Sequence, residues 1–293
     1  MISNRAFRLG ASLALAMLHA GVLHAAPPIV AKVESLQMPA WVERGGVKAS
    51  IKAGWAMYAG DRITTGATGR LELTLAGDAR VKLSGKADLT LNSGYAASGA
   101  SLLQLSSGAV HIVASPMGGG DGVPFTIGQG LHARLTAGQA WAKADTRQDL
   151  MVLITGSAQI RGASPSWQMT EPETVLMIPH GGQAQPVIPV APERLAQWLA
   201  LTEPASGRPT LSASGLWDVS LQSGYNLKEL EAYACKVQDR GFPSEIYPVR
   251  ETGKQVWYRV MVRRFASRDD AMDFARLGKS LDSDDAWVLL PQQ

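Results

Sequence analysis

The sequence contains few features that would support disulfide cross-linking or nucleic-acid binding. Its one cysteine, Cys235, cannot form an intramolecular disulfide, and its place in a helical pattern predicts a small buried side chain. Charged residues make up 18% of the 293 residues, and the formal net charge is +3. Proteins that bind nucleic acid hold its phosphates with clusters of Lys and Arg. The near balance of basic and acidic residues in this chain therefore argues against nucleic acid as a partner.

Beyond its first residues, the chain also lacks long hydrophobic runs. Arg5 and Arg8 precede an apolar segment from Leu9 to Val22, and Leu23-His24-Ala25 then places a small residue at a cleavage position. That order is typical of a secretory signal peptide, which we place at residues 1–25. An uncleaved anchor is the alternative, because the leucine of that triplet is larger than the residue usual there. We expect export to the periplasm, with no membrane contact after cleavage.

Motifs for catalysis and metal binding are also missing from the sequence. His111, His132 and His180 are isolated and have no metal-ligand spacing. The acidic run from Asp282 to Asp285 lacks the glycine and distal glutamate of a calcium loop, and the glycines of Gly118–Gly122 do not begin a helix. No Gly-x-Ser-x-Gly sequence occurs. We therefore expect a protein that is not an enzyme and that needs neither cofactor nor metal.

What the sequence does contain, over residues 29–190, is a series of short alternating segments separated by Gly, Asp and Asn. Alternation with a period of two is typical of half-buried strands, and regular turn signals indicate an all-β sandwich, roll or solenoid. The expected strands are residues 70–75, 80–84, 87–91, 102–105, 109–113, 131–135, 140–144, 150–154 and 158–160.

A different pattern follows over residues 191–214. Residues 192–201 predict a short helix with Pro192 in its first turn, and its apolar stripe should pack on the β segment through Leu195, Trp198 and Leu199. The Pro, Gly and Ser content of residues 202–215 indicates an interdomain linker.

Residues 215–293 predict a small α+β domain. Asn226 and Ser267 are suitable N-caps for two helices, and Gly241 should end the first of them. The element order is strand, helix, strand, strand, helix, strand, which predicts a ferredoxin-like βαββαβ domain with a four-stranded sheet and both helices on one face. The helices should cover Val219, Leu221, Ile246, Val260, Val262 and Val288.

The other face of that sheet is expected to be open and to carry bulky polar and aromatic side chains. Alternation places on it Asp218, Ser220, Gln222, Tyr247, Val249, Trp257, Arg259, Met261, Arg263 and Trp287. An exposed patch of aromatic, Arg and Met side chains is typical of a binding site. A covering protein segment or dimer partner is the alternative explanation, and a β-bulge could shift individual residues.

The C-terminal domain resembles the SPOR domain, a module that binds glycan strands of bacterial peptidoglycan. The resemblance covers Trp217 to Leu290 and lies in the element order, in Tyr258-Arg-Val260 followed by Val262 and Phe265, and in Ala271. Its first strand, Val219-Ser-Leu-Gln-Ser-Gly-Tyr225, has Ser220 where the family usually has Gln. Arg263 and Arg264 stand where Gly-Pro is usual. These arginines either add an anion contact or mark a changed ligand.

The β-rich segment resembles the FecR-like extracytoplasmic domain. The matching residues are Ala59-Gly-Asp-Arg-Ile-Thr-Thr-Gly66, Gly69 to Leu75, Leu102 to Gly108, and Pro124-Phe125. The family's Arg-Gly-Thr element is absent, and Leu135-Thr-Ala-Gly138 stands about where it is expected. Sensor proteins with this domain carry a cytoplasmic region before it, whereas only the signal-like segment precedes it here. We therefore expect a binding or scaffold module.

Two functions from different classes are compatible with the sequence. The first is a periplasmic peptidoglycan-binding protein with glycan contacts at Ser220, Gln222, Tyr247, Trp257, Arg259, Met261 and Trp287. In that case cell-wall or division proteins would bind the β domain, and the protein could gather at the division septum, where glycans stripped of stem peptides are expected for the family. The second is a protein-interaction scaffold whose SPOR-like domain no longer binds glycan.

Overall fold

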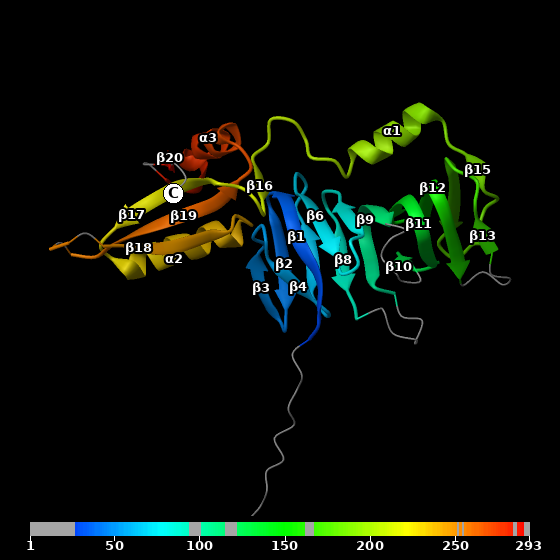
Figure 1. Ribbon diagram of the computed structural model, residues 1–293, viewed down its shortest axis with the longest axis horizontal. Helices are drawn as coiled ribbons and strands as arrows, with labels where there is room; N and C mark the ends of the chain where they lie inside the picture. Colours follow the sequence, from blue (N-terminus) through cyan, green and yellow to red (C-terminus); the bar gives the residue numbers. More distant parts are fainter. Residues whose placement is uncertain are drawn as a thin grey trace, which may run out of the picture.

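The computed structural model describes residues 27–93, 101–114, 122–161, 167–250, 252–253, 255–283 and 286–289 (Figure 1). The expected signal peptide, the glycine loop at 118–122 up to residue 121, and two residues of the acidic run at 282–285 lie outside these ranges. Among the described helices, none is long and apolar enough to span a bilayer.

The β region, residues 27–190, consists of short strands joined by turns. Its strands are β1 (Ile29–Gln37), β2 (Ala40–Arg44), β3 (Val47–Ser50), β4 (Ala56–Tyr58), β5 (Arg62–Thr65), β6 (Arg70–Leu75), β7 (Arg80–Leu83), β8 (Asp88–Leu91), β9 (Leu103–Ala114), β10 (Val123–Ile127), β11 (Leu131–Ala144), β12 (Gln148–Arg161), β13 (Trp167–Met169), β14 (Thr174–Pro179) and β15 (Ile188–Pro189).

These strands pair in two rows that enclose one core. One row runs β1-β6-β7-β9-β11-β12-β14-β15, and the other runs β3-β2-β5-β8-β9-β10-β11-β12-β13. Alternation fixes the buried side of each strand; in β6, for example, Leu71, Leu73 and Leu75 are buried while the residues between them are half-buried. Residues of both rows belong to a single hydrophobic cluster. The β-rich layout is therefore as expected from the alternation.

Three pairs of expected short strands are instead three long, bent strands, β9, β11 and β12, and each of them takes part in both rows. The bends in β11 and β12 coincide with Gly138 at φ +99° and Gly156 at φ +85°, which pair with each other. A Cβ on either glycine would collide with the backbone of the opposite strand. A glycine in this sequence thus marks a bend within a strand, where we had expected a strand to end.

Helix α1 (Pro192–Ala200) packs on the β region as predicted. Leu195 is buried, and the ring of Trp198 stacks on that of Trp141 with centroids 5.4 Å apart and planes 3° apart.

The segment that follows α1, which we expected to be a linker, is held against β1. Strand β16 (Thr210–Ser212) pairs with β1 and also meets β19 (Trp257–Phe265) through Leu211 and Phe265. The side chain of Gln37, only 2% exposed, donates to the Ala205 carbonyl and accepts from the Ala205 N–H. A buried amide needs such partners, so this segment is ordered between the two halves of the chain.

The C-terminal unit, residues 217–289, has helices and strands in the expected order. They are β17 (Trp217–Gly224), α2 (Leu227–Asp239), β18 (Ser244–Val249), β19, α3 (Arg268–Arg276), the 3-10 helix η1 (Gly278–Leu281) and β20 (Trp287–Leu289).

Its strands pair antiparallel in the order β20-β17-β19-β18. The side chains of Asn226 and Ser267 cap α2 and α3 as predicted, each accepting from the N–H three residues later. Val219, Leu221, Val260 and Val262 are fully buried in the core that they share with both helices. Cys235, however, is exposed, which corrects the expectation of a buried thiol; the apolar face of α2 consists of its neighbours Leu230, Tyr233, Ala234 and Val237.

Candidate functional site

The strand register defines an open face of the C-terminal sheet, opposite the shared core. Directly paired residues of an antiparallel sheet lie on the same side of it. One row across the sheet consists of Trp287, Ser220, Met261 and Glu245. The next row consists of Ser223, Arg259 and Tyr247, and Trp257 pairs with Val249 beyond it. We use the term open face for the set Ser220, Ser223, Tyr247, Trp257, Arg259, Met261 and Trp287. Two of these residues are not exposed as expected, because Ser220 is fully buried and Met261 is 7% exposed beneath their larger neighbours.

Six of the seven expected contact residues lie on this face, and the seventh, Gln222, does not. The register of β17 slips between Ser220 and Gln222, so that Gln222 pairs with the fully buried Val260. An extra residue in one strand reverses the side on which the following residues lie. Ser223 therefore takes the place opposite Arg259 that we had expected Gln222 to occupy. Nothing in the local sequence marks this bulge, and Ser223 was missed for that reason.

Arg259 lies at the centre of the open face, between two tryptophans. Its guanidinium carbon lies 4.8 Å from the ring centroid of Trp257 and 5.6 Å from that of Trp287. Both distances fall within the range of cation–π attraction, which restrains the arginine and keeps the two rings near it. Trp287 remains 39% exposed, so one aromatic surface is available to a ligand.

Three polar atoms of the open face are buried and have no partner among the residues that the structure describes. They are Oγ of Ser220, Oγ of Ser223 and Nε of Arg259. Buried polar groups in folded proteins are usually hydrogen-bonded, to protein or to ordered water. Because these atoms have almost no accessible surface, a polar ligand can reach them only if the side chains around them move.

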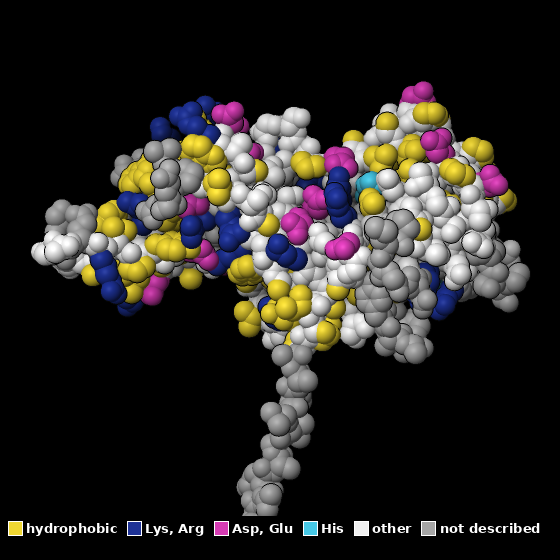
Figure 2. All heavy atoms as spheres, viewed as in Figure 1, with side chains coloured by type: hydrophobic (Ala, Val, Ile, Leu, Met, Phe, Trp, Pro, Cys, Tyr) yellow, Lys and Arg dark blue, Asp and Glu magenta, His cyan; other side chains and the backbone are white. Residues whose placement is uncertain are grey.

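A groove of about 680 Å³ is lined by three residues of the open face, Tyr247, Arg259 and Met261, and neither Trp257 nor Trp287 lines it. Its walls include Asp218, Tyr247, Arg259, Met261 and Arg263. In Figure 2, hydrophobic and basic side chains lie close together over the C-terminal unit, on the left of the view. The groove lining combines the apolar side chains of Val249, Met261 and Leu289 with several charged side chains, so it offers both kinds of contact to a ligand.

Arg263 is bound to neighbours within the protein. Its Nε donates to Asp218 Oδ2 at 2.7 Å and its Nη1 donates to the Tyr247 hydroxyl at 3.0 Å. The hydrogen bonds with Tyr247 and Asp218 raise the pKa of Arg263 above its ordinary value. The backbone N–H of Arg264 donates a hydrogen bond to Asp218 Oδ1, and its Nη1 donates one to the Ala213 carbonyl. Both unusual arginines thus build the wall of the groove.

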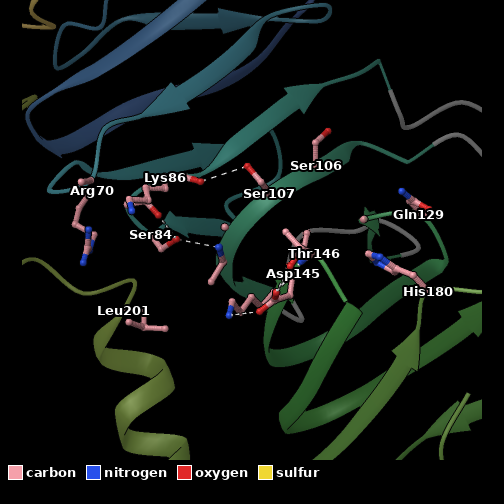
Figure 3. Close-up of a pocket in the computed structure, with 17 residues that line it drawn as sticks. Arg70, Ser84, Lys86, Ser106, Ser107, Gln129, Asp145, Thr146, His180 and Leu201 are labelled. Atoms are coloured by element: carbon pink, nitrogen blue, oxygen red, sulfur yellow. Dashed lines mark hydrogen bonds and ion pairs between the residues drawn. The ribbon is translucent and has the colours of Figure 1, made fainter. Parts of the chain in front are cut away.

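A second hollow, of about 810 Å³, lies in the β region (Figure 3). It is lined by Arg70, Lys86, Lys143 and His180, together with several serines. Figure 3 shows Ser84 and His180 at opposite ends of the hollow. His180 instead contacts Asp149 at 3.2 Å, and no serine of the hollow is hydrogen-bonded to a histidine among the described residues. The arrangement therefore lacks the nucleophile and base pair of a hydrolase.

Comparison with known proteins supports an assignment only for the C-terminal part. The family model described as SPOR domain matches residues 213–289. No curated protein matches the chain. Two crystal structures of a "putative anti-sigma factor" from Parabacteroides distasonis align at 12% identity with a TM-score of 0.39. The first alignment covers 47% of this chain and 64% of the other, and the second covers 79% and 98%. A likeness this low supports no assignment for the β region.

Proposed function

We propose that this protein is a non-catalytic, exported protein that binds glycan strands of peptidoglycan through the open face of its C-terminal unit. The observation that carries the proposal is the position of Arg259 between Trp257 and Trp287. Its own Nε and the Oγ atoms of Ser220 and Ser223 are buried and lack a partner in the described part of the chain. Sugar rings present C–H surfaces to aromatic rings and hydroxyls to polar atoms, so both parts of the face have a role.

The match of the SPOR domain family to residues 213–289 supports the same ligand, because SPOR domains bind peptidoglycan. Export to the periplasm and residence at the division septum belong to this proposal, as does a role for the β region as a FecR-like binding or scaffold module. The chemistry asked of the protein is binding alone, without cofactor or metal.

One observation favours the alternative of a protein-interaction scaffold. Part of the groove wall is already engaged, because Arg263 is bonded to Asp218 and to Tyr247. A face whose charges are satisfied internally is better suited to a less polar partner. In that case the intact protein would not bind glycan and would instead form a complex with another periplasmic protein.

Co-sedimentation of the full chain with purified sacculi distinguishes the two functions. Wild-type protein should pellet with sacculi, and Arg259→Ala should weaken binding by about tenfold or more, since charge-assisted hydrogen bonds contribute about 1.5–3 kcal/mol. Trp257→Ala should act in the same direction. Arg268→Ala, on the exposed start of α3, is the matched control and should bind like wild type. Failure of the wild-type protein to pellet would refute glycan binding.

A further inference from the structure

The β region and the C-terminal unit are docked against each other along a defined junction. Strand β16 connects β1 to β19, and Figure 1 shows it between the two parts. An ion pair joins Lys52 of the β region to Glu245 of β18. These contacts fix the open face next to the surface of the β region that contains Lys52.

A smaller hollow of about 280 Å³ lies at this junction, and we call it the junction hollow. Lys52, Gly54 and Trp55 line it from the β region, and Glu245 lines it from the C-terminal unit. It shares the residues Tyr247, Arg263 and Arg264 with the groove on the open face. The two hollows therefore adjoin, with these three side chains as their common wall.

The lining of the junction hollow suits a sugar that carries a carboxylate. The Lys52 ammonium lies 4.9 Å from the centroid of the Trp55 ring, so a cation and an aromatic surface are adjacent. Lys52, Arg263 and Arg264 supply three positive charges, of which Glu245 pairs with Lys52 and Asp218 with Arg263, so one net positive charge remains beside the hollow. The excess of positive charge favours an anionic group, and the ring offers a surface for sugar C–H groups.

The backbone at the junction is arranged around Arg264. Arg264 has φ +70°, a left-handed conformation that is uncommon for a residue with a side chain. Such conformations concentrate at ligand clamps and other functional sites. Gly54 of the β region faces this arginine, and a Cβ added there would lie 3.2 Å from Arg264 Nη1. The absence of a side chain at Gly54 leaves room for the guanidinium beside the hollow.

We propose that the junction hollow is a second subsite for the same ligand, so that a carboxylate-bearing glycan strand continues from the open face onto the β region. This inference rests on the proposed glycan binding. Trp55 stacks on a sugar ring, and Lys52 with Arg264 holds the carboxylate of an acidic sugar. The β region thus contributes directly to the site, and the full site is longer than the C-terminal sheet.

The test measures binding of the full chain to peptidoglycan glycan oligomers without stem peptides, in a short and a long size class, by calorimetry. Trp55→Ala should weaken binding of long oligomers by about tenfold and leave short oligomers unaffected. Trp55→Phe should retain most of the affinity because it keeps an aromatic ring. Lys52→Gln should weaken the binding of long oligomers by about threefold. Lys48→Ala is the matched control, since its ammonium lies over Trp41 and lines neither hollow.

Three outcomes are distinguishable. Weaker binding of long oligomers alone, in both Trp55→Ala and Lys52→Gln, supports the second subsite. If both variants bind all sizes like wild type while Trp257→Ala loses binding, the subsite is refuted and the proposed function stands. If wild-type protein binds no oligomer, both proposals are refuted. The radius of gyration from solution scattering should match wild type in each variant, which separates loss of a subsite from separation of the two parts.

Discussion

Gly241 occupies the point where α2 ends and the C-terminal unit contacts the β region. Its φ is +83°, and its N–H donates to the Gln238 carbonyl while that of Phe242 donates to the Val237 carbonyl. This pair of bonds is a Schellman motif, which requires the left-handed conformation. A Cβ at this position would collide with Pro39 and lie 2.7 Å from the Trp41 ring.

Two costs follow for Gly241→Ala. The left-handed conformation costs an alanine about 1–2 kcal/mol. Forcing a methyl group against a packed proline and indole costs about a further 1–3 kcal/mol. The expected loss in the free energy of unfolding is therefore about 2–5 kcal/mol. Gly253→Ala is the matched control, because Gly253 has φ +76° but no heavy atom within 4 Å of an added Cβ, so only the first cost applies.

Urea denaturation of the full chain, followed by tryptophan fluorescence, measures both variants. Gly241→Ala should lower the free energy of unfolding by more than Gly253→Ala does, and solution scattering should show a larger radius of gyration for Gly241→Ala alone. Equal losses in the two variants, with unchanged scattering, would refute the packing of α2 on Trp41 and with it the docked arrangement of the two parts.

Two further predictions concern the β region. Burial lowers the pKa of His111 below its ordinary 6.5, although the hydrogen bond with Gln139 opposes the shift. The unfolded chain therefore binds more protons at this residue below that pH, and the melting temperature should fall as the pH drops from 7 to 5. His111→Gln should reduce this fall. Asp61→Asn should lower the free energy of unfolding in urea by about 2–3 kcal/mol, because the fully buried Asp61 accepts two hydrogen bonds from Arg44 at 2.7 Å. An undiminished pH dependence in His111→Gln, or an unchanged stability of Asp61→Asn, would contradict these assignments.

Hydrophobic alternation and helix-capping residues are local signals, and most of the correctly predicted secondary structure rests on them. The buried positions of β6, the N-caps at Asn226 and Ser267, and the stop at Gly241 follow from the sequence because each depends on residues within one turn or one strand. The same holds for the apolar stripe of α1, which packs where its period indicates.

Features that depend on distant partners could not be read from the sequence. The bulge in β17 moves Ser223 onto the open face in place of Gln222, and it is defined only by pairing with β19. Likewise, the segment after α1 has the composition of a linker, and it is fixed because Gln37, more than 150 residues earlier in the chain, needs hydrogen-bond partners. The partners of Arg263 also lie on other strands.

The central claim, that glycan binds the open face, is tested most directly by the methyl resonance of Met261. Met261 lies on that face and lines the groove with 7% of its surface exposed, whereas Met57 and Met151 are fully buried in the β region. Full-length protein labelled at its methionine methyl groups is titrated with glycan oligomers that lack stem peptides. We predict a progressive shift of the Met261 methyl signal, with the Met57 and Met151 signals unchanged. Binding of the oligomers without any change at Met261 would contradict the proposed site.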